Sequence, residues 1–508
     1  MPNLPVRRAS PREIASMNAR ASSGCSPQAF RRYASGLLLA LGASCSEPPD
    51  PPAPAPTPTG PNVLLIVIDT ARADHFSCYE YERRTTPRID KFARDAVTYR
   101  NASSPAPWTL PAHASMFTGL PSGLHGMRWI QTPPDEEGLA TGALRPEAQR
   151  RLLAERFRQA GYRTLGISNN GWISKTTGLD HGFERFWHIQ TEREVIADYL
   201  EWPAEHSVPR QLAGLAGGSI ALLKRELSSL GSDERFFAFL NLIDPHSPYR
   251  APKGYRFFFE GSTPEHQALR RDWADKHYEL ATLAGAERPD PELLATLYDQ
   301  EIRYADDVLG NLFRWLRQHG LYDDALIVVT SDHGEHMGEN GRYSHQLSVE
   351  RELLWVPLII KYPGNAGAGT VEESSLVSTA DVYQTLLATT GDTQAEASPW
   401  SQDLQRMDRF ARSWTLSEYY YSDAYLAQLE ALNPAFDAEP HRTVRRVIHT
   451  RQGRTVFAGA ERVSGSTEAP ELQAYETYVE RVEALPVGAT SHDDPELLEA
   501  LRELGYVE

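Results

Sequence analysis

Three strongly apolar segments in this chain each lead directly into an acidic residue. The segments are residues 63–68, 236–243 and 325–329, and the acids that follow them are Asp69, Asp244 and Asp332. A short run rich in β-branched residues, without alternating polar positions, is typical of a parallel strand that is covered on both faces. The chain is therefore predicted to fold around a parallel sheet.

The carboxyl ends of these predicted strands should bring chemically useful side chains together, because ligands of open parallel sheets bind in the crevice outside those ends. His246 follows Asp244 by two residues, and His333 follows Asp332 directly. Carboxylates and imidazoles are common ligands of divalent metals. We therefore expect a metal site at this edge, and an enzyme.

Strand and helix patterns alternate from residue 62 to about residue 400. Helices are predicted over residues 90–97, 146–160, 289–319 and 378–390, with further strands over residues 164–168 and 355–360. The alternation predicts an α/β fold with a large, mainly parallel sheet flanked by helices. Later strand-like segments and a closing helix predict a small C-terminal α+β subdomain; they are residues 415–421, 443–450 and 495–504. Residues 132–145 and 464–472 are predicted to be loops, and the two domains to span residues 61–400 and 401–508.

Charge and composition exclude several classes of protein. Lys and Arg number 51 against 68 Asp and Glu, giving a net charge of −17. Such a negative net charge argues against a protein that binds the phosphate backbone of nucleic acids. With 41% hydrophobic and 23% charged residues the composition is that of a folded protein. No apolar stretch reaches the roughly 18 residues that a membrane-spanning helix needs.

The first 60 residues differ from the rest of the chain. Arg31 and Arg32 precede a short apolar stretch and the small residues before Cys45, which resembles a bacterial lipoprotein signal. A proline-rich run follows, and such a run favours extended polyproline II. We expect a signal peptide over residues 1–44 and a linker over residues 45–60. The protein would be exported to the periplasm or cell surface and attached to the membrane only by a lipid on Cys45. The alternative is an unstructured N-terminus without export.

A loop between the first two strands leads into a short helix that starts near Thr109. Pro107 and Pro111 lie near its start and Gly119 follows its end, which matches the polarity of helix termini. Free N–H groups and the positive end of the helix dipole favour an anionic group there. Considered alone, a threonine in this place is more often a simple helix cap.

Residues 62–126 resemble the sulfatase family of the alkaline phosphatase superfamily. The resemblance rests on Leu-Ile-Val-Ile-Asp-Thr ending at residue 70 and on Ala-Pro-Trp-Thr-Leu-Pro-Ala-His-Ala-Ser-Met-Phe-Thr-Gly ending at residue 119. It resumes with Asp-Pro-His-Ser-Pro-Tyr at residues 244–249 and Ser-Asp-His-Gly-Glu at residues 331–335, and covers nearly all of residues 62–395. The resemblance implies a metal-dependent hydrolase of anionic esters.

The departures from the sulfatase pattern concern the nucleophile. Thr109 stands where sulfatases have the Cys or Ser that becomes formylglycine, and His113 replaces the arginine of that motif. Oxidation of a threonine yields a ketone and not the required aldehyde. Thr70 replaces a second acid, and His333 stands where sulfatases often have Asn. These changes resemble threonine-dependent relatives in the superfamily, such as nucleotide pyrophosphatases and lipoteichoic acid synthases.

The expected site contains one divalent ion, held by Asp69, Thr109, Asp332 and His333. Mixed carboxylate and imidazole ligands favour Zn²⁺ or Mn²⁺ over Ca²⁺. Thr109 is the expected nucleophile, activated by the ion. His246 and His345 are expected to bind substrate oxygens and to protonate the leaving group. The alternative is a second metal bound by Asp244, His246 and His345.

The substrate is an anionic ester whose class stays open at this point. A threonyl sulfate cannot expel sulfate by elimination, which favours phosphate mono- or diesters, whereas the family resemblance favours sulfate. Alternatives are a phosphodiesterase or phospho-group transferase that acts on a lipid or glycan, and a surface lipoprotein without catalysis. The expected partner is a small molecule or a glycan or lipid head group, and not a nucleic acid.

Overall fold

A computed structural model of the protein describes residues 57–130, 140–192, 195–196, 199, 216–260, 263–275, 288–391, 398–409, 412–486 and 488–491. These residues all belong to one unit, Ala55–Glu508. The expected signal peptide, most of the linker and the predicted closing helix over residues 495–504 lie outside the described residues.

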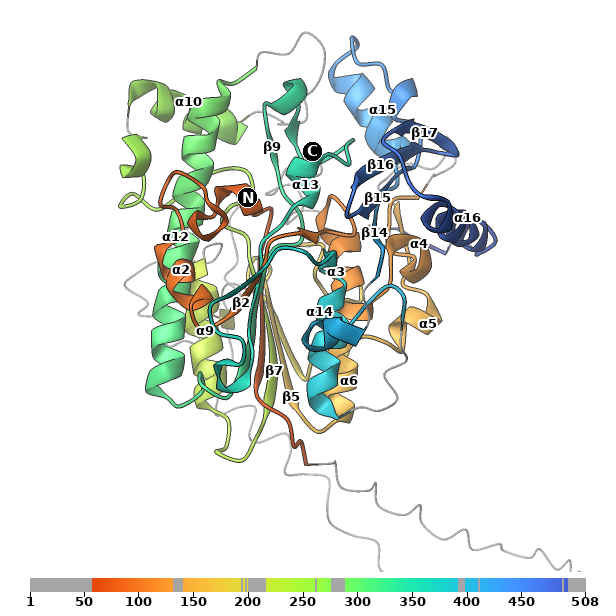
Figure 1. Ribbon diagram of the computed structural model, residues 1–508. Coiled ribbons are helices and arrows are strands. Elements are labelled where there is room, and N and C mark those ends of the chain that lie inside the picture. The colour runs from red at the N-terminus through yellow and green to blue at the C-terminus, as the bar shows by residue number, and fades with distance from the viewer. Residues whose placement is uncertain are drawn as a thin grey trace, which may run out of the picture. The chain divides into compact units, whose positions relative to one another are not determined.

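An eight-stranded sheet forms the centre of the fold (Figure 1). Its order is β12 (Thr370–Glu372), β2 (Val97–Tyr99), β11 (Leu358–Lys361), β8 (Leu326–Thr330), β1 (Val63–Ile68), β7 (Phe236–Leu242), β5 (Arg163–Ser168) and β6 (Arg185–His188). The five strands from β8 to β6 are parallel to one another, and β11 runs antiparallel to both β8 and β2. The predicted mainly parallel sheet is confirmed.

Both faces of β1 are covered, which explains its unbroken apolar sequence. Leu64, Ile66 and Ile68 belong to one core, which also contains residues of three helices; these are α2 (Pro87–Ala93), α9 (Ala216–Ser228) and α12 (Pro291–Gln318). The alternate residues face a second core with helices on the other side (Figure 1); these are α3 (Thr109–Thr118), α6 (Leu153–Gln159) and α14 (Asp381–Leu387). Successive strand residues point to opposite faces, so both must be apolar.

Several smaller elements complete the core of the fold. They are α4 (Ser122–His125), α5 (Pro146–Gln149), α10 (Pro264–Asp275), α13 (Arg351–Leu354), the strand pair β3 (Ala102–Ser103) and β13 (Val377–Ser378), and the hairpin β9 (His336–Met337) and β10 (Tyr343–Ser344). Within the described part of the chain, no helix is both long and apolar enough to cross a membrane.

The C-terminal part forms a separate antiparallel sheet. Its strands are β14 (Trp414–Tyr419), β15 (Arg445–Thr450), β16 (Gly453–Ala458) and β17 (Glu461–Ser464), with helices α15 (Asp423–Leu432) and α16 (Ala469–Glu483) nearby (Figure 1). This is the small C-terminal subdomain predicted from the sequence. The Glu418 N–H donates to the Pro105 carbonyl at 2.9 Å, so β14 contacts the segment that leads into α3.

Some predicted elements were wrong in their extent. The helix predicted over residues 146–160 is two helices, α5 and α6, because Leu152 between them has extended ψ (125°) and packs into the core. The helix predicted over residues 90–97 begins at Pro87, where proline suits a first turn, and Val97 starts β2. Residues 140–142 form strand β4, which pairs with β18 (Ala489–Ser491), and α16 begins inside the predicted loop 464–472.

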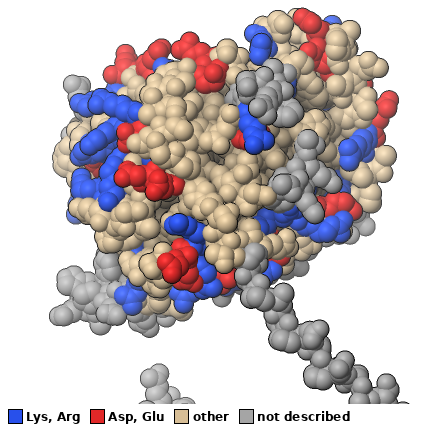
Figure 2. Space-filling model, turned by 60° about the horizontal axis from the view of Figure 1, so that its bottom comes forward, with Lys and Arg blue, Asp and Glu red and all other residues tan. Residues whose placement is uncertain are grey.

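Figure 2 views the molecule from the side of the amino ends of the strands, opposite to the edge where the three acidic residues lie. On this face basic and acidic side chains are interspersed among uncharged residues. The charged groups therefore form no single-sign surface on this face.

Gly334 marks a close approach between the chain after β8 and helix α13. A Cβ atom at this position would lie 1.9 Å from the Glu352 carbonyl oxygen and 2.9 Å from Arg72 Cγ. We therefore predict that Gly334→Ala lowers the free energy of unfolding by roughly 1–3 kcal/mol, because the backbone must move to admit a methyl group. Chemical denaturation measures this loss.

Gly254→Ala is the matched control, since a Cβ atom there would meet no atom within 4 Å. Equal stability of the two variants would contradict the close approach at Gly334.

Candidate active site

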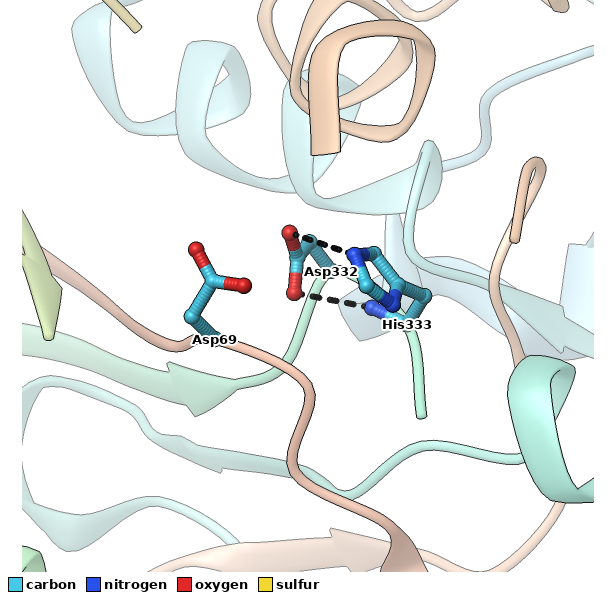
Figure 3. A group of neighbouring side chains, drawn as sticks. All are labelled: Asp69, Asp332 and His333. Atoms are coloured by element: carbon cyan, nitrogen blue, oxygen red, sulfur yellow. Dashed lines mark hydrogen bonds and ion pairs between the residues drawn. The ribbon is translucent and has the colours of Figure 1, made fainter. Parts of the chain in front are cut away.

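Polar side chains follow four neighbouring strands at the carboxyl edge of the sheet. Asp69 follows β1, Asp332 and His333 follow β8, Asp244 follows β7 and Asn170 follows β5. Asp69, Asp332 and His333 each offer one donor atom, and these three atoms lie within 4.8 Å of one another. In Figure 3 the Asp332 carboxylate lies between Asp69 and the His333 ring. All three residues are fully buried.

The backbone after β1 is shaped to hold this group. Thr70 has a positive φ of 54°, which is unusual for a β-branched residue and persists only where surrounding contacts hold it. Its N–H donates to Asp332 Oδ1 at 3.1 Å, and the next N–H, of Ala71, donates to Ser331 Oγ at 2.8 Å. The Tyr298 hydroxyl donates to the Thr70 carbonyl at 2.7 Å. These bonds fix the chain after β1 against the chain after β8.

Thr109 is the first residue of α3 and lies against the same group. Trp108 is the N-cap residue and supplies no side-chain cap, so Thr109 is not the helix cap that its residue type alone favours. Thr109 Oγ1 lies 3.3 Å from His333 Nε2. Asn170 Nδ2 donates to Thr109 Oγ1 at 3.2 Å and to Asp69 Oδ2 at 2.9 Å. The hydroxyl is therefore held at the positive end of a helix, beside an imidazole and a carboxylate.

The donor atoms fit a bound cation. His333 Nδ1 donates to the Gly334 carbonyl at 2.9 Å, which leaves the Nε2 lone pair toward Thr109. Asp69 Oδ1 is buried without a hydrogen-bond partner, and Asp332 Oδ2 lies 3.4 Å from His333 Nε2, which also carries a lone pair. Such an arrangement is costly unless something positive satisfies these atoms. Two carboxylates, an imidazole and a hydroxyl are ligands that Zn²⁺ and Mn²⁺ accept. Asp69, Thr109, Asp332 and His333 would hold the ion.

The pKa values of Asp69, Asp332 and His333 also indicate that the site needs a positive charge. Burial raises the pKa of Asp69 to about 6, and repulsion by Asp332 adds to the rise. Burial raises the pKa of Asp332 to about 7. Burial also lowers the pKa of His333 to about 4, and the neighbouring His345 contributes. Each pKa shift means that burial disfavours the charged form of that side chain. A cation that binds the two carboxylates therefore lowers the free-energy cost of burying them.

Two further histidines lie beside this group. The rings of His345 and His333 have centroids 4.6 Å apart, and those of His246 and His345 lie 5.1 Å apart. Both His246 and His345 are at most 4% exposed. The three catalytic candidates predicted from the sequence, which include Thr109, are therefore brought to one place.

Asp244 is oriented toward another part of the fold. Its Oδ2 accepts the N–H of Ala216 at the start of α9, at 2.8 Å. Within the described ranges, Asp244, His246 and His345 are not among the groups of three donors whose atoms lie within 4.8 Å of one another. At this edge the described residues thus assemble the donor group of Asp69, Asp332 and His333, and the choice between one metal and two stays a prediction.

Other residues of the site were not assigned from the sequence. Asn241 Nδ2 donates to Asp69 Oδ2 at 3.1 Å, as Asn170 does at 2.9 Å. Asn241 is the single polar residue in the second apolar segment, residues 236–243. A polar residue inside such a segment was a sequence signal that Asn241 contacts a polar group of the site. His113 Nδ1 donates to the Thr109 carbonyl at 3.0 Å. His113 therefore supports the local helix, in place of the arginine of the sulfatase motif.

Comparison with known proteins agrees with this geometry. Residues 61–392 match the family model Sulfatase, and this span contains every residue of the site. A multifunctional alkaline phosphatase superfamily protein, PehA of Trinickia caryophylli, is 28% identical over 64% of this chain and 73% of its own length. The arylsulfatase of Clostridium perfringens (strain 13 / Type A) is 25% identical over 64% of this chain and 74% of its own length.

A solved structure shares the fold. The phosphonate monoester hydrolase SpPMH from Silicibacter pomeroyi aligns with a TM-score of 0.58 and 20% identity, over 85% of this chain and 99% of its own. The family match covers more than half of the chain and includes the carboxylates and the imidazole that gather at the sheet edge. The protein therefore belongs to the sulfatase family and is a hydrolase of sulfuric or phosphoric esters.

Proposed function

We propose that the protein is a metal-dependent hydrolase of phosphate mono- or diesters and that Thr109 is its nucleophile. The observation that carries this proposal is the position of the Thr109 hydroxyl. It lies at the first turn of α3, 3.3 Å from His333 Nε2, inside a buried set of carboxylate and imidazole donors. A weak nucleophile needs such a setting to react.

The choice of phosphate over sulfate follows from the chemistry of threonine. A sulfated formylglycine hydrate expels sulfate by elimination and regenerates its aldehyde, a route that a threonyl ester lacks. In the proposed reaction the Thr109 oxygen attacks phosphorus, the bond to the leaving oxygen breaks, and that oxygen takes a proton. Water then attacks the phosphorus of this intermediate, and phosphate (from a monoester) or a phosphate monoester (from a diester) leaves as the Thr109 hydroxyl is restored. Both steps consume only the ester and water.

The chain's own residues bind and orient the ester in this scheme. The positive end of α3 faces the transferred group, and Asn170 fixes the Thr109 oxygen through its 3.2 Å hydrogen bond. His246 and His345, at the same edge, bind ester oxygens and exchange protons with them. When bound by Asp69, Thr109, Asp332 and His333, a Zn²⁺ or Mn²⁺ ion supplies positive charge that stabilises the transferred group and activates the hydroxyl.

Replacement of Thr109 tests the nucleophile. We expect Thr109→Ala to lower kcat/KM on the preferred ester by roughly 1000-fold or more, because the group that forms the intermediate is lost. Thr109→Ser should keep measurable activity. Aryl phosphates, phosphodiesters and aryl sulfates are assayed side by side, with an added alcohol acceptor that reveals any transfer.

Thr118→Ala is the control, since Thr118 also lies buried in α3 but donates its hydroxyl to the Ala114 carbonyl. Full activity of Thr109→Ala would overturn the proposed nucleophile, and a preference for sulfate would overturn the substrate class.

Metal removal and pH test the proposed ion. The folded pKa values of Asp69 and Asp332, about 6 and about 7, exceed the unfolded value of about 4. Without the ion these two acids bind more protons in the folded than in the unfolded state, so their contribution to stability falls as pH rises from about 4 to about 7, whereas the lowered pKa of His333 gives the opposite dependence over part of this range. We expect Zn²⁺ or Mn²⁺ to raise the unfolding temperature of protein treated with EDTA, and to raise it more at about pH 7.5 than at about pH 5, because protons compete with the ion for these ligands.

Asp332→Asn provides the comparison, because it removes one of the two carboxylates while other buried acids remain. Its unfolding temperature should respond less to the metal and, relative to wild type, should lose the part of the decrease with pH that Asp332 contributes. An identical pH slope in wild type and Asp332→Asn would contradict the proposed site.

We also propose that residues 1–44 direct export and that Cys45 carries a lipid. The support is the sequence alone, with basic, apolar and small-residue segments in order before Cys45. Cells fed labelled palmitate should label the wild type and Cys78→Ser, which changes a cysteine of the folded part, but not Cys45→Ser. An unlabelled wild type with an intact N-terminus would refute the proposal.

A further inference from the structure

Glu335 is a buried carboxylate of the site that the proposed chemistry has not yet used. It is 1% exposed, and His345 is 3% exposed. His345 Nδ1 lies 2.9 Å from Glu335 Oε1. A carboxylate accepts hydrogen bonds, so this contact places the ring hydrogen of His345 on Nδ1. The neutral ring then carries a lone pair on Nε2.

The fold holds Glu335 rigidly in this position. Arg72 Nη1 donates to the Glu335 carbonyl at 3.0 Å, and the same guanidinium is fixed by two bonds to Asp74, at 3.0 and 2.8 Å. On the other side of Glu335, Gly334 packs against the Glu352 carbonyl with no room for a side chain. These contacts fix the backbone on both sides of the Glu335 side chain, and from this backbone the carboxylate reaches the His345 ring.

His246 is oriented by a different kind of group. Its Nδ1 lies 2.6 Å from the Ser247 carbonyl, which is neutral. A carboxylate stabilises an imidazole that gains a proton far better than a carbonyl does, which is the function of the acidic member of a catalytic triad. Burial lowers the pKa of His246, and the charges of Asp69 and Glu335, which also act on this ring, oppose that fall. His345 has the direct hydrogen bond to the Glu335 carboxylate, and this bond suits the His345 ring to take up a proton.

We propose that Glu335 is a positioning residue that holds His345 as the general base of the second step, the hydrolysis of the phosphothreonine. This inference rests on the proposed function. His345 Nε2 takes a proton from the attacking water as the water oxygen bonds to phosphorus. The bond between phosphorus and Thr109 Oγ1, which lies on the opposite side of phosphorus from the attacking water, then breaks. Oγ1 takes a proton from solvent and His345 gives its proton to solvent, so the proton count balances and both groups return to their starting states.

The test separates the two chemical steps with 4-nitrophenyl phosphate and bis(4-nitrophenyl) phosphate as substrates. In Glu335→Gln the amide oxygen can still accept a hydrogen bond from His345 Nδ1, but the negative charge that stabilises a protonated ring is lost. We expect steady-state kcat to fall roughly 10–100-fold while the first equivalent of nitrophenol is still released rapidly. Acid-quenched protein should then carry phosphate on Thr109 with the monoester and a 4-nitrophenyl phosphoryl group on Thr109 with the diester, both detected by mass spectrometry.

His345→Gln should show the same burst, and the double variant should be no slower than either single variant, because the two residues act as one unit. Glu350→Gln, a carboxylate in the same part of the chain that contacts Asn340 and Arg342, should behave as wild type. Thermal unfolding identifies any variant that fails to fold, and His345→Gln then serves alone.

Two sets of outcomes overturn the idea in distinguishable ways. If Glu335→Gln and His345→Gln slow the burst and the steady state equally, or if their effects multiply, the positioning role is wrong while the nucleophile stands. If the wild type hydrolyses these esters and no variant ever carries phosphate on Thr109, the proposed function itself fails.

Discussion

The fold forces two aspartates against each other at one edge of a sheet. Strands β1 and β8 are hydrogen-bonded neighbours and run parallel, with Val67 opposite Thr330. Two residues further on, the chain reaches Asp69 and Asp332, whose donor atoms lie within 4.8 Å with His333. Like charges buried so close are unstable unless a cation or protons neutralise them. The positive charge that this site requires is thus a consequence of strand pairing.

The surrounding contacts serve to keep those carboxylates in place. The Ser104 hydroxyl donates to the Asp332 carbonyl, and the Ser417 hydroxyl of β14 donates to the Ser104 carbonyl at 2.5 Å. The C-terminal sheet is therefore linked by two hydrogen bonds to the backbone of a metal-ligand candidate. This gives the C-terminal subdomain a structural role at the active site, although its own sequence matches the family poorly.

The sheet and the position of its site followed from local sequence, because an unbroken apolar run is visible without knowing its neighbours. Asp69, Asp332 and His333 were found because they follow such runs. Thr109 was found through the resemblance to the sulfatase motif, because a threonine at a helix start is by itself more often a cap. The residues and boundaries that the sequence did not predict depend on contacts with residues far away in the chain. Asn170 contacts Asp69, which lies 101 positions away, and no local pattern encodes that pairing. Likewise, the break at Leu152 depends on the core that receives its side chain.

The complete burial of β1 on both faces has a consequence for how the protein loses activity. The atoms that set the spacing of the site are anchored in two hydrophobic cores that share this strand. Loosening either core moves Asp69 relative to Asp332, so no partially melted form can keep the site assembled. Thermal inactivation and global unfolding should be a single event, and a stabilising change deep in either core should extend the working temperature of the enzyme without touching its chemistry.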